Sequence, residues 1–368
     1  MRVPYNDLHA QYLTLKADID AAIERTVRTS AFIRGPEVEA FEQAYARLLG
    51  VKHCVSCANG TDALYIAFRG LGLRPGDEVI TTAQSWISSA ETVTQAGGSV
   101  VFADTDGSTY TVDPDALEKK VTPRTKGIVP VHLYGQPADM DAIDAVARKH
   151  GLWVVEDCAQ AHLARHRGRL AGTMGAAAAF SFYPGKNLGA MGDAGCLVTN
   201  DDRLADFAAM FARHGGKRKG DHEIEGINSR LDGLQAAILN AKLPHLESWT
   251  RRRQALAARY GALLAGVGDL VLPAVAQGRE HVYHIYAVRT ARRDAMRDHL
   301  AANGVQTQIN YPVALPFLPA YRRLGHRPTD FPNAYRDQAQ VLSLPLFPEI
   351  TDTQVEIMAA EIRSFFGK

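Results

Sequence analysis

The sequence predicts an α/β fold, in which a large domain with a mixed, mostly parallel sheet between helices is followed by a smaller C-terminal α+β domain. From about residue 78 to 199, short β-branched runs alternate with helical runs, as they do when crossover helices connect the strands of a parallel sheet. From about residue 230 longer helices replace this alternation. The length of 368 residues suits two packed domains.

The alternating region predicts strands and helices in a regular order. The expected strands are 78–82, 99–103, 127–132 and 152–156, with helices at 88–97, 113–120 and 139–151 after the first three. Residues 177–183 and 195–199 add strands without full helices between them. The expected sheet is therefore mixed rather than wholly parallel.

The C-terminal part predicts a connecting helix and a small second domain. Helices are expected at 230–242 and 245–264, the second of them after Pro244, which favours a helix start. A strand at 281–289 and helices at 295–304 and 352–366 follow. We therefore divide the chain into 1–243, with an N-terminal arm, and 244–368. The run 214–225, rich in glycine and charge, is expected to be a loop.

Charge and hydrophobicity exclude several classes of partner. The formal net charge is +1 and the hydrophobic fraction is 46%, so a strongly basic nucleic-acid-binding surface is not expected. The N-terminal residues have no apolar core of the signal-peptide type. No apolar run is long enough to cross a bilayer. A cytoplasmic location without a membrane partner is therefore expected.

The four cysteines favour burial over metal binding. Cys54 and Cys57 form a C-x-x-C pair, but Cys158 and Cys196 do not supply the second pair that a zinc site would need. We expect no metal, and small buried thiols instead.

Lys186 is the first candidate for chemistry. It lies in Ser-Phe-Tyr-Pro-Gly-Lys-Asn-Leu-Gly, residues 181–189, directly after a predicted strand. A lysine held in such a turn and partly removed from water loses proton affinity and becomes a nucleophile. Taken alone, the same residue is more often a solvated charge.

Asp157 and Gln160 follow another predicted strand. A carboxylate at the carboxyl end of a buried strand lies where α/β proteins bind ligands, although a lone aspartate there is more often a helix N-cap. Gln160, three residues later, can present its amide to the same ligand.

A small-residue turn and an aromatic residue complete the pattern. Asn59, Gly60 and Thr61 precede a predicted helix, and free N–H groups at a helix N-terminus suit phosphate as well as a plain turn. The Ser181 hydroxyl can add to this cradle. Trp86 follows the strand at 78–82 and can stack on a flat ring, or serve as a core or interface aromatic.

Together these residues match the needs of pyridoxal phosphate (PLP). That cofactor requires a lysine for its imine, an anion for the pyridinium nitrogen and a hydrogen-bond partner for the ring hydroxyl. It also requires a phosphate cradle and a flat group against the ring. Each item is modest by itself, but their occurrence in one sequence predicts a PLP-binding large domain.

Longer stretches around these residues resemble the DegT/StrS family of sugar aminotransferases. The matching segments are SCANGTDAL at 56–64, VEDCAQAHLARHRG at 155–168, FSFYPGKNLGAMGDAGCLVTND at 180–201 and GINSRLDGLQAAIL at 226–239. Members have the aspartate-aminotransferase fold and use PLP. The resemblance is strong from about Gly35 to Leu239 and weaker afterwards.

The resemblance implies a role for each candidate residue. Lys186 would carry the cofactor and shuttle protons, Asp157 would pair with the pyridine nitrogen, and Gln160 with the ring hydroxyl. Gly60, Thr61 and Ser181 would hold the phosphate, and Trp86 would cover the ring. Asn228 would reach the phosphate in the neighbouring subunit, which implies a homodimer with shared active sites. Tyr183, Asn310 and Tyr311 are the candidate substrate-binding residues.

The resemblance also implies the reaction. The family moves an amino group, usually from glutamate, to a nucleotide-linked keto sugar. Related dehydratases carry histidine in place of the lysine, so Lys186 argues against that activity. The run Asn-Ser-Arg-Leu-Asp at 228–232 is more similar to members that aminate carbon 3 than to those that aminate carbon 4.

One segment departs from the family pattern. Residues 308–321 read Gln-Ile-Asn-Tyr-Pro-Val-Ala-Leu-Pro-Phe-Leu-Pro-Ala-Tyr, where the family often has histidines. Asn310 and Leu315 therefore change the groups expected near the sugar.

Other functions stay open at this stage. They are a 4-keto sugar, a cyclitol or another non-nucleotide ketone as substrate, a PLP lyase, and a non-enzymatic sensor with the same fold. The basic residues Lys217, Arg218 and Lys219 suit either a diphosphate group or a solvated loop.

Overall fold

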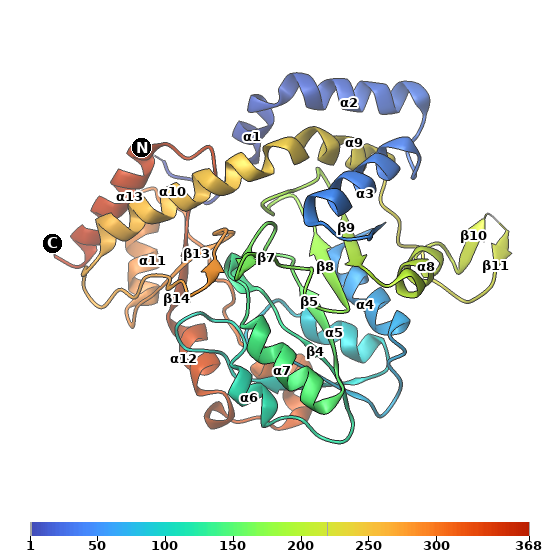
Figure 1. Ribbon diagram of the computed structural model, residues 1–368. Helices are drawn as coiled ribbons and strands as arrows, with labels where there is room; N and C mark the ends of the chain where they lie inside the picture. The colour runs from blue at the N-terminus through green and yellow to red at the C-terminus, as the bar shows by residue number, and fades with distance from the viewer. Residues whose placement is uncertain (1, 219, 368) are drawn as a thin grey trace.

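A computed structural model describes residues 2–218 and 220–367 and contains a seven-stranded sheet between helices (Figure 1). The sheet order is β1-β9-β8-β5-β4-β2-β3. Only β9 runs against its neighbours, because it pairs antiparallel with β1 and β8 while the other pairs are parallel. The predicted mixed, mostly parallel sheet is confirmed. The strands of this sheet are β1 (His53–Cys57), β2 (Glu78–Thr82), β3 (Ser99–Ala103), β4 (Thr125–Val129), β5 (Trp153–Asp157), β8 (Ala177–Ser181) and β9 (Gly195–Thr199).

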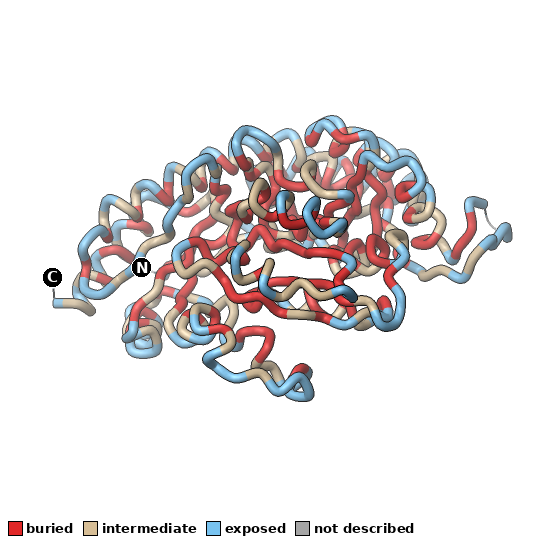
Figure 2. Tube along the Cα trace, turned by 60° about the horizontal axis from the view of Figure 1, so that its bottom comes forward, coloured by how far each residue is buried: buried red, intermediate tan, exposed pale blue. Residues whose placement is uncertain are grey.

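Helices cover both faces of this sheet. One face packs on α4 (Gly60–Gly70), α5 (Ser88–Gln95) and α8 (Asp202–Phe211). The other packs on α3 (Pro36–Leu49), α7 (Met140–His150) and α9 (Gly233–Lys242), with the short α6 (Pro114–Glu118) beside α7. The strands between them are buried along most of their length (Figure 2), which explains their nearly continuous apolar sequences.

The C-terminal part has a core of its own. The long helix α10 (Leu246–Leu264) leads away from the sheet toward α11 (Arg293–Ala302) and α13 (Asp352–Phe365), which flank the pair β13 (Tyr286–Arg289) and β14 (Val341–Leu344) (Figure 1). The N-terminal residue Val3 pairs with Val305 and joins this core. The division of the chain at residue 243 stays a prediction, because 314–334 return to pack in the core of the large sheet.

The remaining elements are short or lie at the periphery. They are α1 (Leu8–Thr14), α2 (Lys16–Thr29), α12 (Pro332–Gln340), β6 (Arg165–His166), β7 (Arg169–Leu170), β10 (Gly216–Arg218), β11 (Asp221–His222) and β12 (Arg279–Glu280), with five 3-10 turns at Leu133–Gly135, Leu243–His245, Leu315–Phe317, Pro319–Leu324 and Pro328–Asp330 among the described residues. The β10–β11 hairpin extends away from the body in Figure 1. It occupies the run expected to be a loop, and Lys219, one of the basic residues considered for a diphosphate group, lies outside the described residues. Across the described residues, none of the helices combines the length and apolar character needed to span a bilayer.

The predicted strand at 281–289 is too long. Only Tyr286–Arg289 pair as a strand. Before them, Val282 N–H donates to the Gly135 carbonyl and Ile285 N–H to the Tyr134 carbonyl. These backbone groups are therefore used to attach the segment to the large sheet rather than to extend β13.

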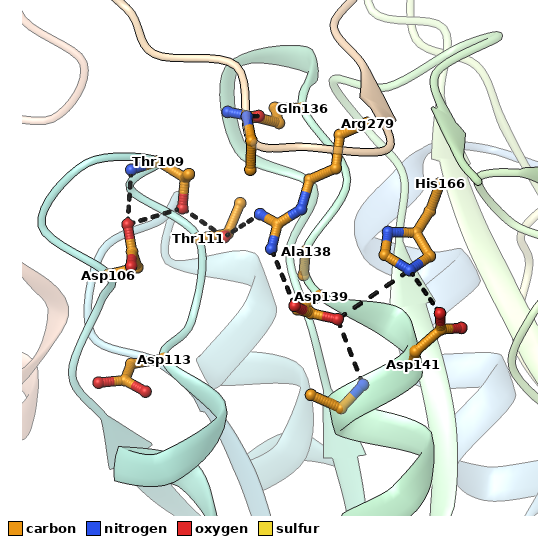
Figure 3. A network of polar contacts seen from close by, with 12 residues as sticks. Asp106, Thr109, Thr111, Asp113, Gln136, Ala138, Asp139, Asp141, His166 and Arg279 are labelled. Atoms are coloured by element: carbon orange, nitrogen blue, oxygen red, sulfur yellow. Dashed lines mark hydrogen bonds and ion pairs between the residues drawn. The ribbon is translucent and has the colours of Figure 1, made fainter.

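Polar contacts also hold the N-terminal part of this segment, residues 274–279 (Figure 3). Arg279 on β12 donates to the Thr111 hydroxyl and forms an ion pair with Asp139 at 3.3 Å. Gln136 donates to the Ala274 carbonyl and accepts from Ala276 N–H. Residues 274–285 are consequently fixed against the large sheet before the chain reaches β13.

All four cysteines are free and buried, as expected. Cys158 lies beside a buried pair formed by His132 and Glu156. Ala138 N–H donates to His132 Nδ1, so the ring proton is on Nε2, which donates to Glu156 at 2.9 Å. Both groups are thus committed to hydrogen bonds within the fold.

Glu156 also organises the loop that follows β7. Its two oxygens accept backbone N–H groups of Gly172, Met174 and Gly175 at 2.7–2.8 Å. Burial raises the pKa of Glu156, but the hydrogen bonds from His132 and the backbone outweigh it and lower the pKa below its usual value. Since the folded pKa is below the unfolded one, this carboxylate stabilises the fold above the unfolded pKa of about 4.3.

We predict that Glu156→Gln lowers the stability of the protein. One oxygen becomes an NH₂ group that faces N–H donors, so we expect a loss of roughly 2–4 kcal/mol and less loss of stability on acidification than in the wild type. Urea denaturation followed by circular dichroism at neutral and acidic pH measures both effects. The matched control is Glu118→Gln, whose carboxylate bonds Lys149 at the surface. Equal midpoints for Glu156→Gln and the control contradict the prediction.

Candidate active site

A cavity of about 840 Å³ opens at the carboxyl ends of the sheet strands. Asp157 ends β5 and Ser181 ends β8, while the turns after β1 and β2 contribute Gly60 and Trp86. Because these strands are parallel, their carboxyl ends meet at one edge of the sheet. The cavity wall includes most of the site residues predicted from the sequence: Gly60, Thr61, Trp86, Asp157, Gln160, Ser181, Tyr183, Lys186, Asn310 and Tyr311.

The turn that carries Lys186 is fixed from several directions. Lys186 N–H donates to the Tyr183 carbonyl, and Asn187 Nδ2 donates to the Val282 carbonyl. Behind the turn, the buried ammonium of Lys242 on α9 donates to the Gly189 carbonyl at 2.8 Å. The backbone of the turn therefore holds Lys186 at the cavity.

The Lys186 amine is poised between its charged and neutral forms. Burial lowers the pKa of Lys186 to about 8, while Asp157 acts in the opposite direction. A group with this pKa is about one-tenth free base at pH 7, and a free amine is needed both for imine formation and for proton transfer.

Asp157 presents a fully ordered carboxylate. One oxygen accepts the Ser89 hydroxyl at 2.7 Å, and the other accepts Ala159 N–H at 3.1 Å. A carboxylate oxygen has a second lone pair, so Asp157 can also accept a proton-bearing ring nitrogen. The helix-cap alternative is not what the structure shows, since Asp157 caps no helix.

Gln160 has one side of its amide fixed. Its oxygen accepts Tyr134 N–H at 2.6 Å, and its nitrogen donates to the Tyr311 hydroxyl at 2.9 Å. The orientation of the amide is therefore set, and the second N–H of its nitrogen remains for a ligand oxygen.

The start of α4 forms an anion cradle. Asn59 caps the helix by accepting Asp62 N–H, and within the described residues the N–H groups of Gly60 and Thr61 have no protein partner. A Cβ at Gly60 would lie 2.8 Å from the Ser181 Cβ, so only glycine lets the helix start approach that strand. Together with the helix dipole, this arrangement suits a phosphate group.

His162 fixes the backbone at Ser181, which borders this anion cradle. Its Nε2 donates to the Ser181 carbonyl at 3.0 Å, and its Nδ1 accepts the Tyr45 hydroxyl. Burial lowers the pKa of His162 to about 3, so the imidazole stays neutral and structural.

These contacts fit PLP on four counts. The structure offers a buried amine, a carboxylate with free lone pairs, an oriented amide and an unfilled helix N-terminus around one cavity. The model of the DegT/DnrJ/EryC1/StrS aminotransferase family matches residues 13–363.

The chain belongs to this family.

Known proteins of the DegT/DnrJ/EryC1/StrS family are similar over nearly the whole chain. A dTDP-3-amino-3,4,6-trideoxy-alpha-D-glucose transaminase of Streptomyces venezuelae is 46% identical and covers 96% of this chain and 93% of its own length. A pleiotropic regulatory protein of Geobacillus stearothermophilus is 44% identical over 100% of this chain and 99% of its own. The crystal structure of S. venezuelae DesV with a ketimine intermediate has a TM-score of 0.97 at 45% identity, covering 100% of this chain and 99% of that one. The chain is an aminotransferase with the fold of this family.

Two predicted aromatic residues lie at the open side of the cavity. Trp86 is 59% exposed and Tyr183 is 58% exposed. Trp86 packs against Tyr311 with ring centroids 5.6 Å apart. The core alternative for Trp86 is therefore wrong, and its stacking on a cofactor ring stays a prediction.

Asn228 does not line the cavity of its own chain. It pairs with Arg213 next to α8. Its neighbour Ser229 is fully buried, where its hydroxyl accepts Ala58 N–H and donates to Asp62. The assignment of Asn228 to the neighbouring subunit stays a prediction.

Sequence reasoning missed several residues of the cavity wall. Tyr5 comes from the N-terminal arm, Arg253 from α10, and His284 and Gln308 from the C-terminal part. Their sequence neighbourhoods carry no signal that places them beside Lys186, because tertiary packing alone brings them there.

Of the two residues at 308–321 that depart from the family pattern, only one lines the cavity. Asn310 lines the cavity, and its side chain lies 3.4 Å from the Tyr5 hydroxyl. Leu315 instead lies in the core against the large sheet and is buried. Only the Asn310 position therefore alters the polar groups that face a ligand.

We predict that the cofactor-free protein takes up PLP at a rate governed by the Lys186 amine. The rate should rise with pH up to about 8 and level off above it, because burial lowers the amine pKa. The growth of visible absorbance after mixing measures this rate. Free N-acetyl-lysine methylamide, with a pKa of about 10.4, is the reference, and Lys186→Ala should give no band. Asp157→Asn should move the midpoint to lower pH, since that carboxylate favours the ammonium. A rate that still rises at pH 10 contradicts the assignment.

Proposed function

We propose that this aminotransferase moves an amino group from glutamate to a nucleotide-linked sugar that carries a keto group at carbon 3. The observation that carries the proposal is the Lys186–Asp157–Gln160 set around one cavity large enough for a cofactor and part of a sugar nucleotide. A non-enzymatic sensor would not need a buried amine with a lowered pKa opposite a carboxylate. That set therefore favours an enzyme over the sensor alternative.

The cofactor is PLP, which supplies an electron sink for the substrate carbon. In our proposal, Gly60, Thr61 and Ser181 bind its phosphate, Asp157 keeps its ring nitrogen protonated, and Gln160 binds its ring hydroxyl. Lys186 holds it covalently in the resting enzyme. Trp86 limits access of water to the ring from the open side of the cavity.

Lys186 is the proposed acid–base residue. Once the donor amine has taken its place on the cofactor, the free Nζ of Lys186 would be the base that takes the proton from the α-carbon of the donor and the acid that gives the proton back. A pKa of about 8 suits both directions of this transfer near neutral pH. The same steps in reverse deliver the amino group to the sugar.

Amination at carbon 3 rests on two observations. The similar transaminase of S. venezuelae is named for a 3-amino sugar. The run 228–232, in which the small and buried Ser229 follows Asn228, is also more similar to family members that aminate carbon 3 than to those that aminate carbon 4.

A homodimer with shared active sites is part of the proposal. Large apolar side chains are exposed on α1, α2 and the following turn, including Leu13, Val27, Phe32 and Ile33. Leu8 of α1 also lines the cavity. A second copy that covers this surface would bring its Asn228 to the phosphate end of the site. The cytoplasmic location also stays a prediction.

We predict that glutamate discharges the visible band of the PLP enzyme and that a nucleotide-linked 3-keto sugar restores it. Stepwise absorbance titration measures both half-reactions, with 4-keto isomers and keto cyclitols as matched comparisons. Restoration by a 4-keto sugar or a cyclitol instead moves the substrate to that alternative. Loss of the band with glutamate but no recovery with any ketone contradicts the substrate class and leaves the aminotransferase.

We predict that two inactive variants regain activity when they form mixed dimers. Asn228→Asp places a negative charge where the phosphate of the partner site is proposed to bind, and Lys186→Ala removes the amine. A mixed dimer contains one site with both native residues, so unfolding and refolding the two variants together should restore turnover. Refolding each variant separately is the control. No recovery, with dimers present by light scattering, contradicts shared sites.

A further inference from the structure

Arg253 on α10 is a buried cation on the cavity wall that the proposed chemistry does not use. Its side chain is 4% exposed. Its Nη1 donates to the Leu346 carbonyl at 2.7 Å, to the Tyr283 carbonyl at 3.2 Å and to the His284 carbonyl at 3.5 Å. These contacts fix the guanidinium plane through one of its three nitrogens.

The opposite edge of the guanidinium is free. Nε is buried without a hydrogen-bond partner, and Nη2 has none among the described residues. Nε and Nη2 form the side-on edge that binds a carboxylate through two parallel hydrogen bonds. The unpaired edge therefore offers the two donors that a carboxylate would need.

No carboxylate of the described residues forms an ion pair with Arg253. Burial lowers the pKa of Arg253 to about 10, while the nearby Glu349 and Tyr5 act in the opposite direction. The residue stays charged at neutral pH. A buried cation without a bonded anion is unfavourable, and an anionic ligand would remove that penalty.

The other positively charged groups of the cavity wall already have a role in the proposed function. Lys186 holds the cofactor, Asp157 faces its ring nitrogen, and the start of α4 receives its phosphate. Among the described lining residues, Arg253 is the remaining permanent cation. The polar groups of Tyr5, Gln308 and Asn310, which share this wall, are neutral at pH 7.

His284 lies close to both Lys186 and Arg253. Its Nδ1 lies 3.2 Å from the Asn187 side-chain oxygen, next to Lys186 in sequence, and its carbonyl accepts from Arg253. Burial lowers the pKa of His284, and the charges of Lys186 and Arg253 both add to that effect. Both cations therefore lie within electrostatic reach of one imidazole at the cavity wall.

We propose that the Nε–Nη2 edge of Arg253 binds a carboxylate of the amino donor, an amino acid of the glutamate type. This inference rests on the proposed function and adds the residue that recognises the donor. The competing occupants are a carboxylate on the sugar and the diphosphate of the nucleotide, which the two half-reactions distinguish.

The test compares Arg253→Lys with the wild-type PLP enzyme in each half-reaction. Lysine keeps a positive charge and a donor for the Leu346 carbonyl but loses the two-pronged edge. We expect the glutamate concentration for half-maximal discharge of the visible band to rise roughly tenfold to a hundredfold. The sugar half-reaction of the amino form should keep its half-saturation value. Arg251→Lys, an exposed residue of the same helix that pairs with Glu247, is the matched control.

Binding of glutarate to the PLP enzyme gives a second readout that involves no turnover. Calorimetry should detect binding in the wild type and in Arg251→Lys, and loss of binding in Arg253→Lys. Unchanged glutamate and glutarate affinities overturn the inference, as does an equal loss in both half-reactions or a loss confined to the sugar.

A variant that cannot hold PLP does not end the test. A crystal structure of the wild-type holoenzyme with glutarate then shows either a carboxylate on Nε and Nη2 of Arg253, which supports the inference, or a carboxylate elsewhere, which overturns it. The proposed function has a separate readout, because it fails when wild-type enzyme does not respond to glutamate at all.

Discussion

The removal of the Lys186 amine from water is the constraint on which the rest of the site depends. Burial lowers its pKa to about 8, and Asp157 limits that decrease. An exposed lysine would remain an ammonium near neutral pH and would neither attack a carbonyl nor accept a proton. The fold supplies this burial at a cost, since Asn187 and Lys242 must anchor the surrounding turn by long-range hydrogen bonds.

Two adjacent acids on β5 show how one strand serves both structure and chemistry. Successive side chains of a strand point to opposite faces of the sheet, so Glu156 and Asp157 enter different environments. The Glu156 carboxylate accepts hydrogen bonds from His132 and from three backbone N–H groups, and these bonds hold the loop at 172–175. Asp157 faces the cavity with lone pairs to spare. The rigidity of the first is what positions the second.

Segments that are far apart in the sequence complete the cavity. Tyr5 arrives from the N-terminal arm, which pairs with Val305, and Arg253 arrives from the helix that leads into the C-terminal core. The segment before β13, which includes His284, is hydrogen-bonded to Gly135 and Gln136 in the loop after β4. The proposed donor site and the proposed cofactor site are thus connected through these hydrogen bonds.

The sequence by itself determined the sheet, the lysine turn and the small-residue start of the helix at Gly60. Those features follow from local patterns: buried strands with continuous apolar residues, a glycine-rich turn around Lys186, and a small-residue helix start at Gly60. Local patterns failed where tertiary contacts take over the backbone, as in the overlong strand at 281–289. They also missed the short hairpin at 216–222, whose backbone pairing is local. Only the tertiary structure placed Arg253 at the cavity and Leu315 in the core, because their positions depend on how distant segments pack rather than on their neighbours in sequence.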